Sequence, residues 1–201
     1  MIPPHRDAGQ AFPIYITVVA GLLFLALAYL AVGQAAVNRS GAQTAADAAA
    51  LAAAQNRRDD LAGQWLLSLK DPAKWQQIFD GRVSFGPSCW RADQLAGQND
   101  GHVEACDDSL ALKITVSVRT DKRVGDSVVP GVQDRRSVEP ATAVIEPLCK
   151  KLPGEDAAGD ALPRLTCKDK VWDLKPDDPS GLPKPYDLFD VHLADSPAND
   201  Q

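Results

Sequence analysis

The stretch PIYITVVAGLLFLALAYLAVG, residues 13–33, decides the architecture of this chain because none of its side chains is charged. No residue from Ala11 to Val37 carries a charge. A helix rises about 1.5 Å per residue, so this run reaches roughly 40 Å and covers a hydrocarbon core of about 30 Å. We predict a transmembrane helix over residues 11–37, with the lipid bilayer around it and a cytoplasmic head over residues 1–10.

A cleavable secretory signal is the alternative interpretation of this stretch. Gly33, Gln34 and Ala35 have the small-x-small pattern of a cleavage site. Signal peptides, however, have an apolar core of about 7 to 15 residues. This run is longer, and its helical pattern continues past the cleavage site, which favours a permanent anchor.

The basic residues and the cysteines give opposite indications of orientation. Arg6 precedes the span, whereas Arg39, Arg57 and Arg58 follow it, so the positive-inside rule alone favours a cytoplasmic C-terminal part. All four cysteines also follow the span, in Asp-, Gly- and Pro-rich segments that we interpret as loops, and their even number suits an oxidising compartment. Long domains are translocated largely regardless of charge. We therefore predict a single-pass protein of the cell membrane, with the N-terminus cytoplasmic and the C-terminal domain extracellular.

Residues 38–70 are predicted to extend the same helix beyond the membrane, because alanine has the highest helix propensity. Gly41 is the predicted site of a bend, since glycine costs about 1 kcal/mol relative to alanine. Large apolar residues then recur at helical spacing and predict a face for docking a domain. They are Leu61, Trp65, Leu66 and Leu69. A second helix is predicted over about residues 72–80.

Alanines repeat every four residues along this extension. Ala45, Ala49 and Ala53 form one series, and Ala46, Ala50 and Ala54 form another. Small side chains allow helix backbones to approach closely. We hypothesise that these alanines form a seam for packing against another helix during assembly.

The run QTAADAAALAAA, residues 43–54, resembles the segment that follows the membrane helix in TadE/TadG-like proteins of tight-adherence (Flp) pilus systems. Together with GQAF at residues 9–12, the resemblance covers about a quarter of the chain. It implies a minor-pilin-like protein whose N-terminal helix packs with other pilus or secretion-assembly membrane proteins, as a homo- or hetero-oligomer. It also makes the Gly9–Gln10 bond a candidate leader cleavage point. The resemblance to prepilins would imply a Glu at the fifth residue after the cleaved glycine, but this chain has Ile14 at that position. Cleavage of a leader after Gly9 and entry into a filament therefore stay open.

Residues 110–120, LALKITVSVRT, alternate apolar and polar side chains and predict a half-buried strand. Weaker strand patterns occupy residues 82–85, 138–145 and 188–193. Pro140 places the second of these at a sheet edge. We predict an α+β, pilin-like fold, in which the long helix packs on a small disulfide-stapled antiparallel sheet domain over residues 71–194. The tail, residues 195–201, is predicted to be disordered.

Cysteine spacing favours two local disulfides, Cys89 with Cys106 and Cys149 with Cys167, although four cysteines permit three connectivities. A loop of roughly 16 to 19 residues contributes about 3 kcal/mol in the chain-entropy model. No C-x-x-C pair is present, which disfavours a zinc site.

Neither the composition nor the motifs indicate an enzyme. A net charge of −6 without a basic cluster argues against nucleic-acid binding. His5, His102 and His192 lie far apart and belong to no metal-binding motif. We predict no catalytic site, metal site or cofactor, and a structural role in pilus or envelope assembly. The alternative is a membrane-anchored extracellular module that binds a small ligand or polysaccharide.

Overall fold

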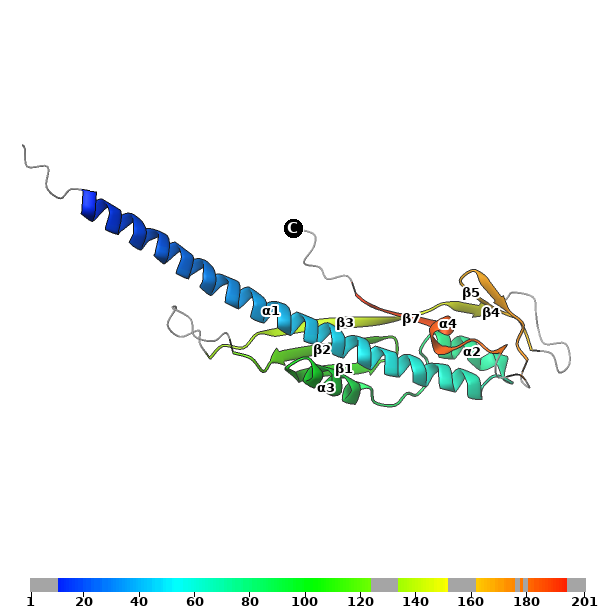
Figure 1. Ribbon diagram of the computed structural model, residues 1–201. Coiled ribbons are helices and arrows are strands. Elements are labelled where there is room, and N and C mark those ends of the chain that lie inside the picture. Colours follow the sequence, from blue (N-terminus) through cyan, green and yellow to red (C-terminus); the bar gives the residue numbers. More distant parts are fainter. Residues whose placement is uncertain (1–10, 124–133, 152–161, 176–177, 179–180, 195–201) are drawn as a thin grey trace, which may run out of the picture.

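A computed structural model describes residues 11–123, 134–151, 162–175, 178 and 181–194. Within them, one long helix projects from an elongated α+β domain (Figure 1). The predicted fold class is therefore confirmed. The predicted cytoplasmic head, the C-terminal tail and the candidate cleavage point at Gly9 and Gln10 lie outside the described residues.

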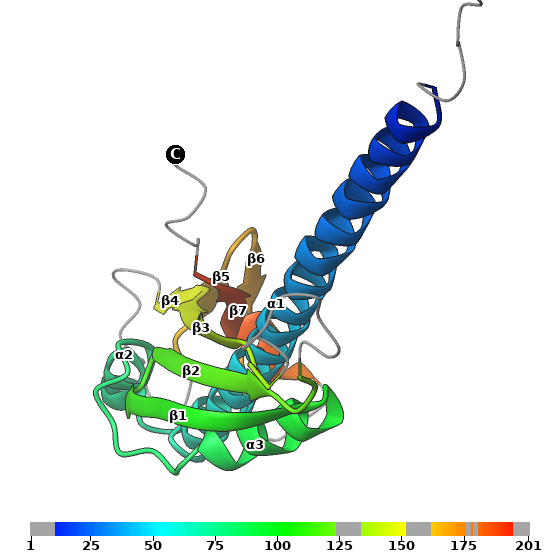
Figure 2. The ribbon, with the colours of Figure 1, turned by 90° about the vertical axis from the view of Figure 1, so that its left-hand side faces the viewer.

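The long helix α1 spans Ala11–Leu67 without interruption, a length of 57 residues. Its N-terminal half stands free, and its C-terminal half runs along the domain (Figures 1 and 2). The helix continues through Gly41, where the sequence predicted a bend, and the ribbon of α1 shows no break along its length (Figure 1). The cost of one glycine is small beside the packing of the following turns on the domain, which keeps the helix continuous.

A four-stranded antiparallel sheet packs against this half of α1. Its strands are β1 (Gly101–Leu110), β2 (Lys113–Thr120), β3 (Val138–Pro147) and β7 (Phe189–Leu193), in the order β1-β2-β3-β7. The alternation predicted for β2 is confirmed, because Ile114, Val116 and Val118 are fully buried. Helix α3 (Cys89–Gln98) lies beside α1 and β1 and adds Ala92 and Ala96 to the same core.

The far end of the domain, away from the free part of α1, carries short elements (Figure 1). They are α2 (Pro72–Phe79), α4 (Pro185–Leu188) and a second sheet of β4 (Cys149–Lys151), β5 (Leu165–Cys167) and β6 (Lys170–Trp172). The prediction of α2 is confirmed. The helix ends at Phe79, and Gly81 two residues later has a φ of +66°, a conformation that glycine adopts without strain.

Several local predictions were wrong. Residues 82–85 form a loop, because this segment bonds to α1 instead of to a strand: Gln64 donates to the carbonyl of Ser84. Helix α3 and strand β1 were missed, and the cysteines lie in helices and strands instead of loops. Strand β3 is an inner strand. Pro140 is tolerated there because β7 pairs with β3 only from Ala143 to Pro147, which leaves one side of Pro140 without a neighbouring strand.

The docking face predicted on α1 holds for three of its four residues. Leu61 and Trp65 of α1 are buried, and so is Leu69 in the turn that follows α1, whereas Leu66 is 52% exposed. Trp65 packs against Trp75 of α2, with ring centroids 5.7 Å apart. This contact joins the end of α1 to the far end of the domain.

Candidate membrane and assembly surface

The N-terminal half of α1 exposes apolar side chains around its whole circumference. Exposed large residues are Ile14, Tyr15, Ile16, Val18, Leu22, Leu23, Phe24, Leu25, Leu27, Tyr29, Leu30, Val32 and Val37. Among the described residues, α1 is the one helix that is long and apolar enough to cross a membrane. A helix that is apolar all round needs an apolar environment on every side. The predicted span at residues 11–37 therefore lies on the part of α1 that the domain leaves uncovered.

Asn38 marks the residue at which this free helix meets the domain. Its side-chain amide donates to the Lys122 carbonyl at 2.9 Å, and its oxygen accepts from the Ser137 backbone N–H at 3.2 Å and from the Thr120 hydroxyl at 3.3 Å. These partners lie at the ends of β2 and β3 that face the free helix. Beside Asn38, Arg39 forms an ion pair with Glu139 at 2.8 Å. The helix is thus attached to the sheet immediately after the apolar run ends.

The alanine seam lies inside the domain. All six residues are fully buried and belong to the core cluster: Ala45, Ala46, Ala49, Ala50, Ala53 and Ala54. At Gly101, a Cβ atom would lie 2.7 Å from Val118 and 3.4 Å from Ala45, so the sheet approaches α1 closely. Small side chains allow this approach, as the sequence suggested, but their partner here is the sheet of the same chain.

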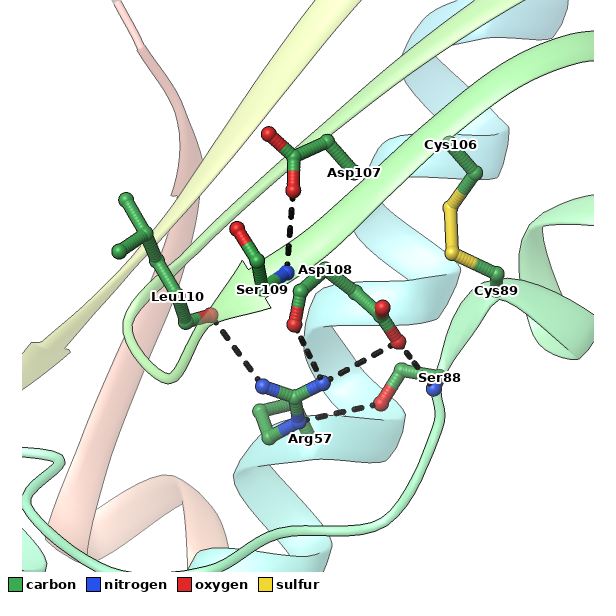
Figure 3. Close-up of a disulfide and its surroundings, with 8 residues drawn as sticks. All are labelled: Arg57, Ser88, Cys89, Cys106, Asp107, Asp108, Ser109 and Leu110. Atoms are coloured by element: carbon green, nitrogen blue, oxygen red, sulfur yellow. Dashed lines mark hydrogen bonds and ion pairs between the residues drawn. A yellow bond between two sulfur atoms is a disulfide. The ribbon is translucent and has the colours of Figure 1, made fainter.

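Arg57 continues the buried face of α1 and is itself fully buried. Its guanidinium donates to the Ser88 hydroxyl at 3.3 Å, to the Leu110 carbonyl at 3.2 Å, and to the carbonyl and carboxylate of Asp108, both at 3.2 Å (Figure 3). Burial lowers the pKa of Arg57, while the negative charges of Asp108 and Asp60 act in the opposite direction. This cluster connects α1 to the start of α3 and the end of β1.

The first disulfide lies beside this arginine cluster. Cys89 at the start of α3 is bonded to Cys106 of β1 (Figure 3). The Asp108 carboxylate also accepts the backbone N–H of Ser88 at 2.7 Å, next to the disulfide. The disulfide and the hydrogen bonds of Arg57 and Asp108 thus hold the start of α3 and the end of β1 against α1.

The second disulfide joins Cys149 of β4 to Cys167 of β5. These residues are direct partners in the antiparallel register, so the bond staples the small sheet. Both pairings are the ones that the cysteine spacing favoured.

Two pairs of neighbouring acids in the sequence, Asp59-Asp60 and Asp107-Asp108, have structural partners instead of forming an open cluster. Asp59 pairs with Arg58, and Asp60 accepts the backbone N–H of Gly86 at 3.3 Å. Hydrogen bonds from Ser109 lower the pKa of Asp107. Among the described residues, no group of His, Cys, Asp and Glu side chains is arranged to hold a metal ion.

Asn38 and Arg57 are the two connecting residues that the sequence analysis missed. Ala53, Arg57 and Leu61 are spaced four residues apart on α1, and all three lie on its buried face. An arginine inside such a series is the sequence signal of a buried cation that needs acceptors.

Taken together, these features define an α+β protein whose one long helix is a candidate membrane anchor at its N-terminal half and the spine of a disulfide-bonded domain at its C-terminal half. Residues 9–56 match the model of a family described as putative Flp pilus-assembly TadE/G-like. The predicted resemblance is thereby confirmed for this part of the chain. The match supports a role related to Flp pilus assembly, a structural and non-enzymatic kind of function, and it fits a membrane-anchored protein.

The matched segment contains the predicted span and the whole alanine seam, and it ends one residue before Arg57. No curated protein and no solved structure matches the chain.

Proposed function

We propose that the chain is a non-enzymatic assembly component of a Tad/Flp-type pilus or a related cell-envelope secretion apparatus. It acts by packing its N-terminal helix against other membrane proteins and by displaying the disulfide-bonded domain outside the cytoplasm. The observation that carries this proposal is the family match over residues 9–56, which coincides with the apolar and alanine-rich parts of one continuous helix.

The assembly surface in this proposal is the uncovered part of α1. The alanine seam is occupied by the sheet of the same chain, whereas residues 13–37 have apolar side chains free to contact other helices or lipid. Because α1 is continuous, lateral contacts made in the membrane determine where the domain is held outside it. The partner is a second copy of this chain or another pilus-assembly membrane protein.

The proposed topology places residues 1–10 in the cytoplasm, residues 11–37 across the bilayer and the domain up to residue 194 outside. Residues 38–70 belong with that domain, because α1 is buried in its core from Ala42 onward. Two disulfides support the outside location, since such bonds persist in oxidising compartments.

Site-directed photocrosslinking tests the assembly role. A benzophenone amino acid replaces Leu27, which points outward from the uncovered helix, in cells that express the pilus machinery. The expected product is a covalent adduct with another pilus-assembly membrane protein or with a second copy. The matched control replaces Leu67, which is 89% exposed at the opposite end of α1. Adducts at Leu67 but none at Leu27 would contradict packing through the membrane helix.

Reporter fusions test the topology separately. Alkaline phosphatase folds to its active form only outside the cytoplasm, so its fusion to the C-terminus of the full chain is expected to be active in a bacterial host. Activity of a cytoplasm-dependent fluorescent fusion at the same position would instead reverse the proposed orientation.

The alternative hypothesis, a membrane-anchored module that binds a small ligand or polysaccharide, predicts a different result when the protein is purified from membranes. Isolation in mild detergent is expected to recover the chain with pilus-assembly proteins. A monomer that carries a bound small molecule would favour the binding module.

A further inference from the structure

A groove of about 590 Å³ lies where the uncovered helix meets the domain. One wall is formed by α1 from Tyr29 through Gly33 to Val37, and the other includes Lys122 and Arg123, which follow the end of β2 at Thr120. The first wall is mainly apolar and the second is charged. Such a groove suits a molecule with an apolar part and a polar part.

A second, polar cavity of about 490 Å³ adjoins this groove through a shared residue. It is lined by Arg119, Arg123, Asp134 and Arg136, and Arg123 lines both cavities. Among the described residues, three guanidinium groups line the cavity with the Asp134 carboxylate, and Arg119 is also paired with Glu104 at 3.1 Å. These groups leave an excess of one positive charge. Arg136 forms no ion pair with any described residue, and the pair between Arg123 and Asp134 is exposed. Exposed ion pairs contribute about 0 to 1 kcal/mol, so these arginines can rearrange to bind another anion.

Lys122 is less available for binding. It donates a hydrogen bond of 2.6 Å to Asp100, which raises the pKa of Lys122. The arginines are therefore the groups that an anion would engage.

The groove lies at the depth where a bilayer surface is expected. Residues 13–33 span about 31 Å as a helix, close to the roughly 30 Å thickness of a hydrocarbon core. The membrane boundary then falls near Gly33, within the groove wall, and Tyr29 lies where aromatic side chains favour the interface. The charged wall consequently meets the lipid headgroups.

From this charge and depth we infer that the groove binds an anionic phospholipid of the surrounding bilayer. The acyl chain lies along Tyr29, Gly33 and Val37, and the phosphate group faces Arg123 and Arg136. The charged wall disfavours an apolar helix as the occupant, because desolvating Asp100 and Lys122 against such a helix would be costly. The inference rests on the membrane-spanning part of the proposed function and is independent of the pilus role.

Lipid competition on the purified full chain tests this site. The chain in detergent micelles is titrated with phosphatidylglycerol or phosphatidylcholine, and bound lipid is measured by native mass spectrometry. The wild-type chain is expected to prefer phosphatidylglycerol. The double variant Arg123→Gln/Arg136→Gln is expected to bind it about fivefold more weakly for each removed charge. Asp134→Asn is expected to strengthen binding, since it removes the carboxylate that competes for Arg123.

The matched control is Lys74→Gln/Arg82→Gln, which removes the same charge at the far end of the domain. Its phosphatidylglycerol binding is expected to be unchanged. Equal losses in both double variants would show a nonspecific charge effect and overturn the site, as would equal affinity of the wild-type chain for the two lipids. Displacement of the lipid by inorganic phosphate would indicate a small-anion site instead.

Membrane insertion of each variant is measured in parallel by resistance to alkaline extraction. A chain that stays inserted but shows no lipid preference refutes the lipid site alone. A wild-type chain that is extracted refutes the membrane anchor on which both proposals depend.

Discussion

Replacing Arg57 by methionine is the sharpest test of how α1 is joined to the domain. Methionine keeps much of the apolar length of the arginine but removes the guanidinium, which donates to Ser88, Asp108 and the Leu110 carbonyl. These acceptors were positioned for a cation, and losing one partner of a buried pair costs about 3 to 5 kcal/mol. The Asp108 side chain is 25% exposed and regains some water, so we expect the lower end, about 3 kcal/mol.

The loss is measured by urea unfolding of the full chain in detergent micelles, followed by tryptophan fluorescence. Trp65 and Trp75 are both buried and report on the core around the end of α1. A loss of about 3 kcal/mol lowers the folding equilibrium constant by more than about a hundredfold, which shifts the midpoint clearly.

The adjacent Arg58→Met is the matched control. Among the described residues, Arg58 forms its ion pair with the exposed Asp59, so the change in stability is expected to be less than about 0.5 kcal/mol. Asp108→Asn completes a double-mutant cycle, with an expected coupling to Arg57 of about 1 to 3 kcal/mol. If Arg57→Met unfolds at the same urea concentration as Arg58→Met, the buried cluster does not stabilise the fold and the reasoning fails.

Three further outcomes follow from the packing. Ala50→Leu inserts a larger side chain between α1 and the sheet and is expected to cost about 1 to 3 kcal/mol in the same unfolding assay, whereas the partly exposed Ala48→Leu should be tolerated. Asn38→Ala removes the partner of the Lys122 carbonyl and the Ser137 N–H, next to the ends of β2 and β3. Amide hydrogen exchange is expected to become faster at these strand ends, whereas amides of the buried core keep their protection. Unchanged exchange at the strand ends would contradict the attachment. Replacing Cys89 and Cys106 by serine is expected to cost about 3 kcal/mol, and an unaltered urea midpoint would show that the bond adds nothing to the polar cluster beside it.

Local patterns were sufficient for the elements with strong periodicity. The alternation through Ile114, Val116 and Val118 predicted β2, because a sheet with one covered face requires apolar residues at every second position. The segments that failed lack such a pattern. Helix α3 is short and polar and contains Gly97, so the sequence alone favours it weakly; the disulfide and its contact with α1 hold it in place.

The sequence by itself determined the membrane-type helix, because 27 consecutive uncharged residues from Ala11 to Val37 are a property of composition and length that needs no partner. Only the tertiary structure decided what the alanine seam packs against. A row of small side chains permits close approach of another helix or of a sheet, and the sequence does not distinguish between them. The attachment at Asn38 and the polar cluster at Arg57 bring the sheet onto that row, so that the buried half of the helix serves the domain and the uncovered half is left for the membrane.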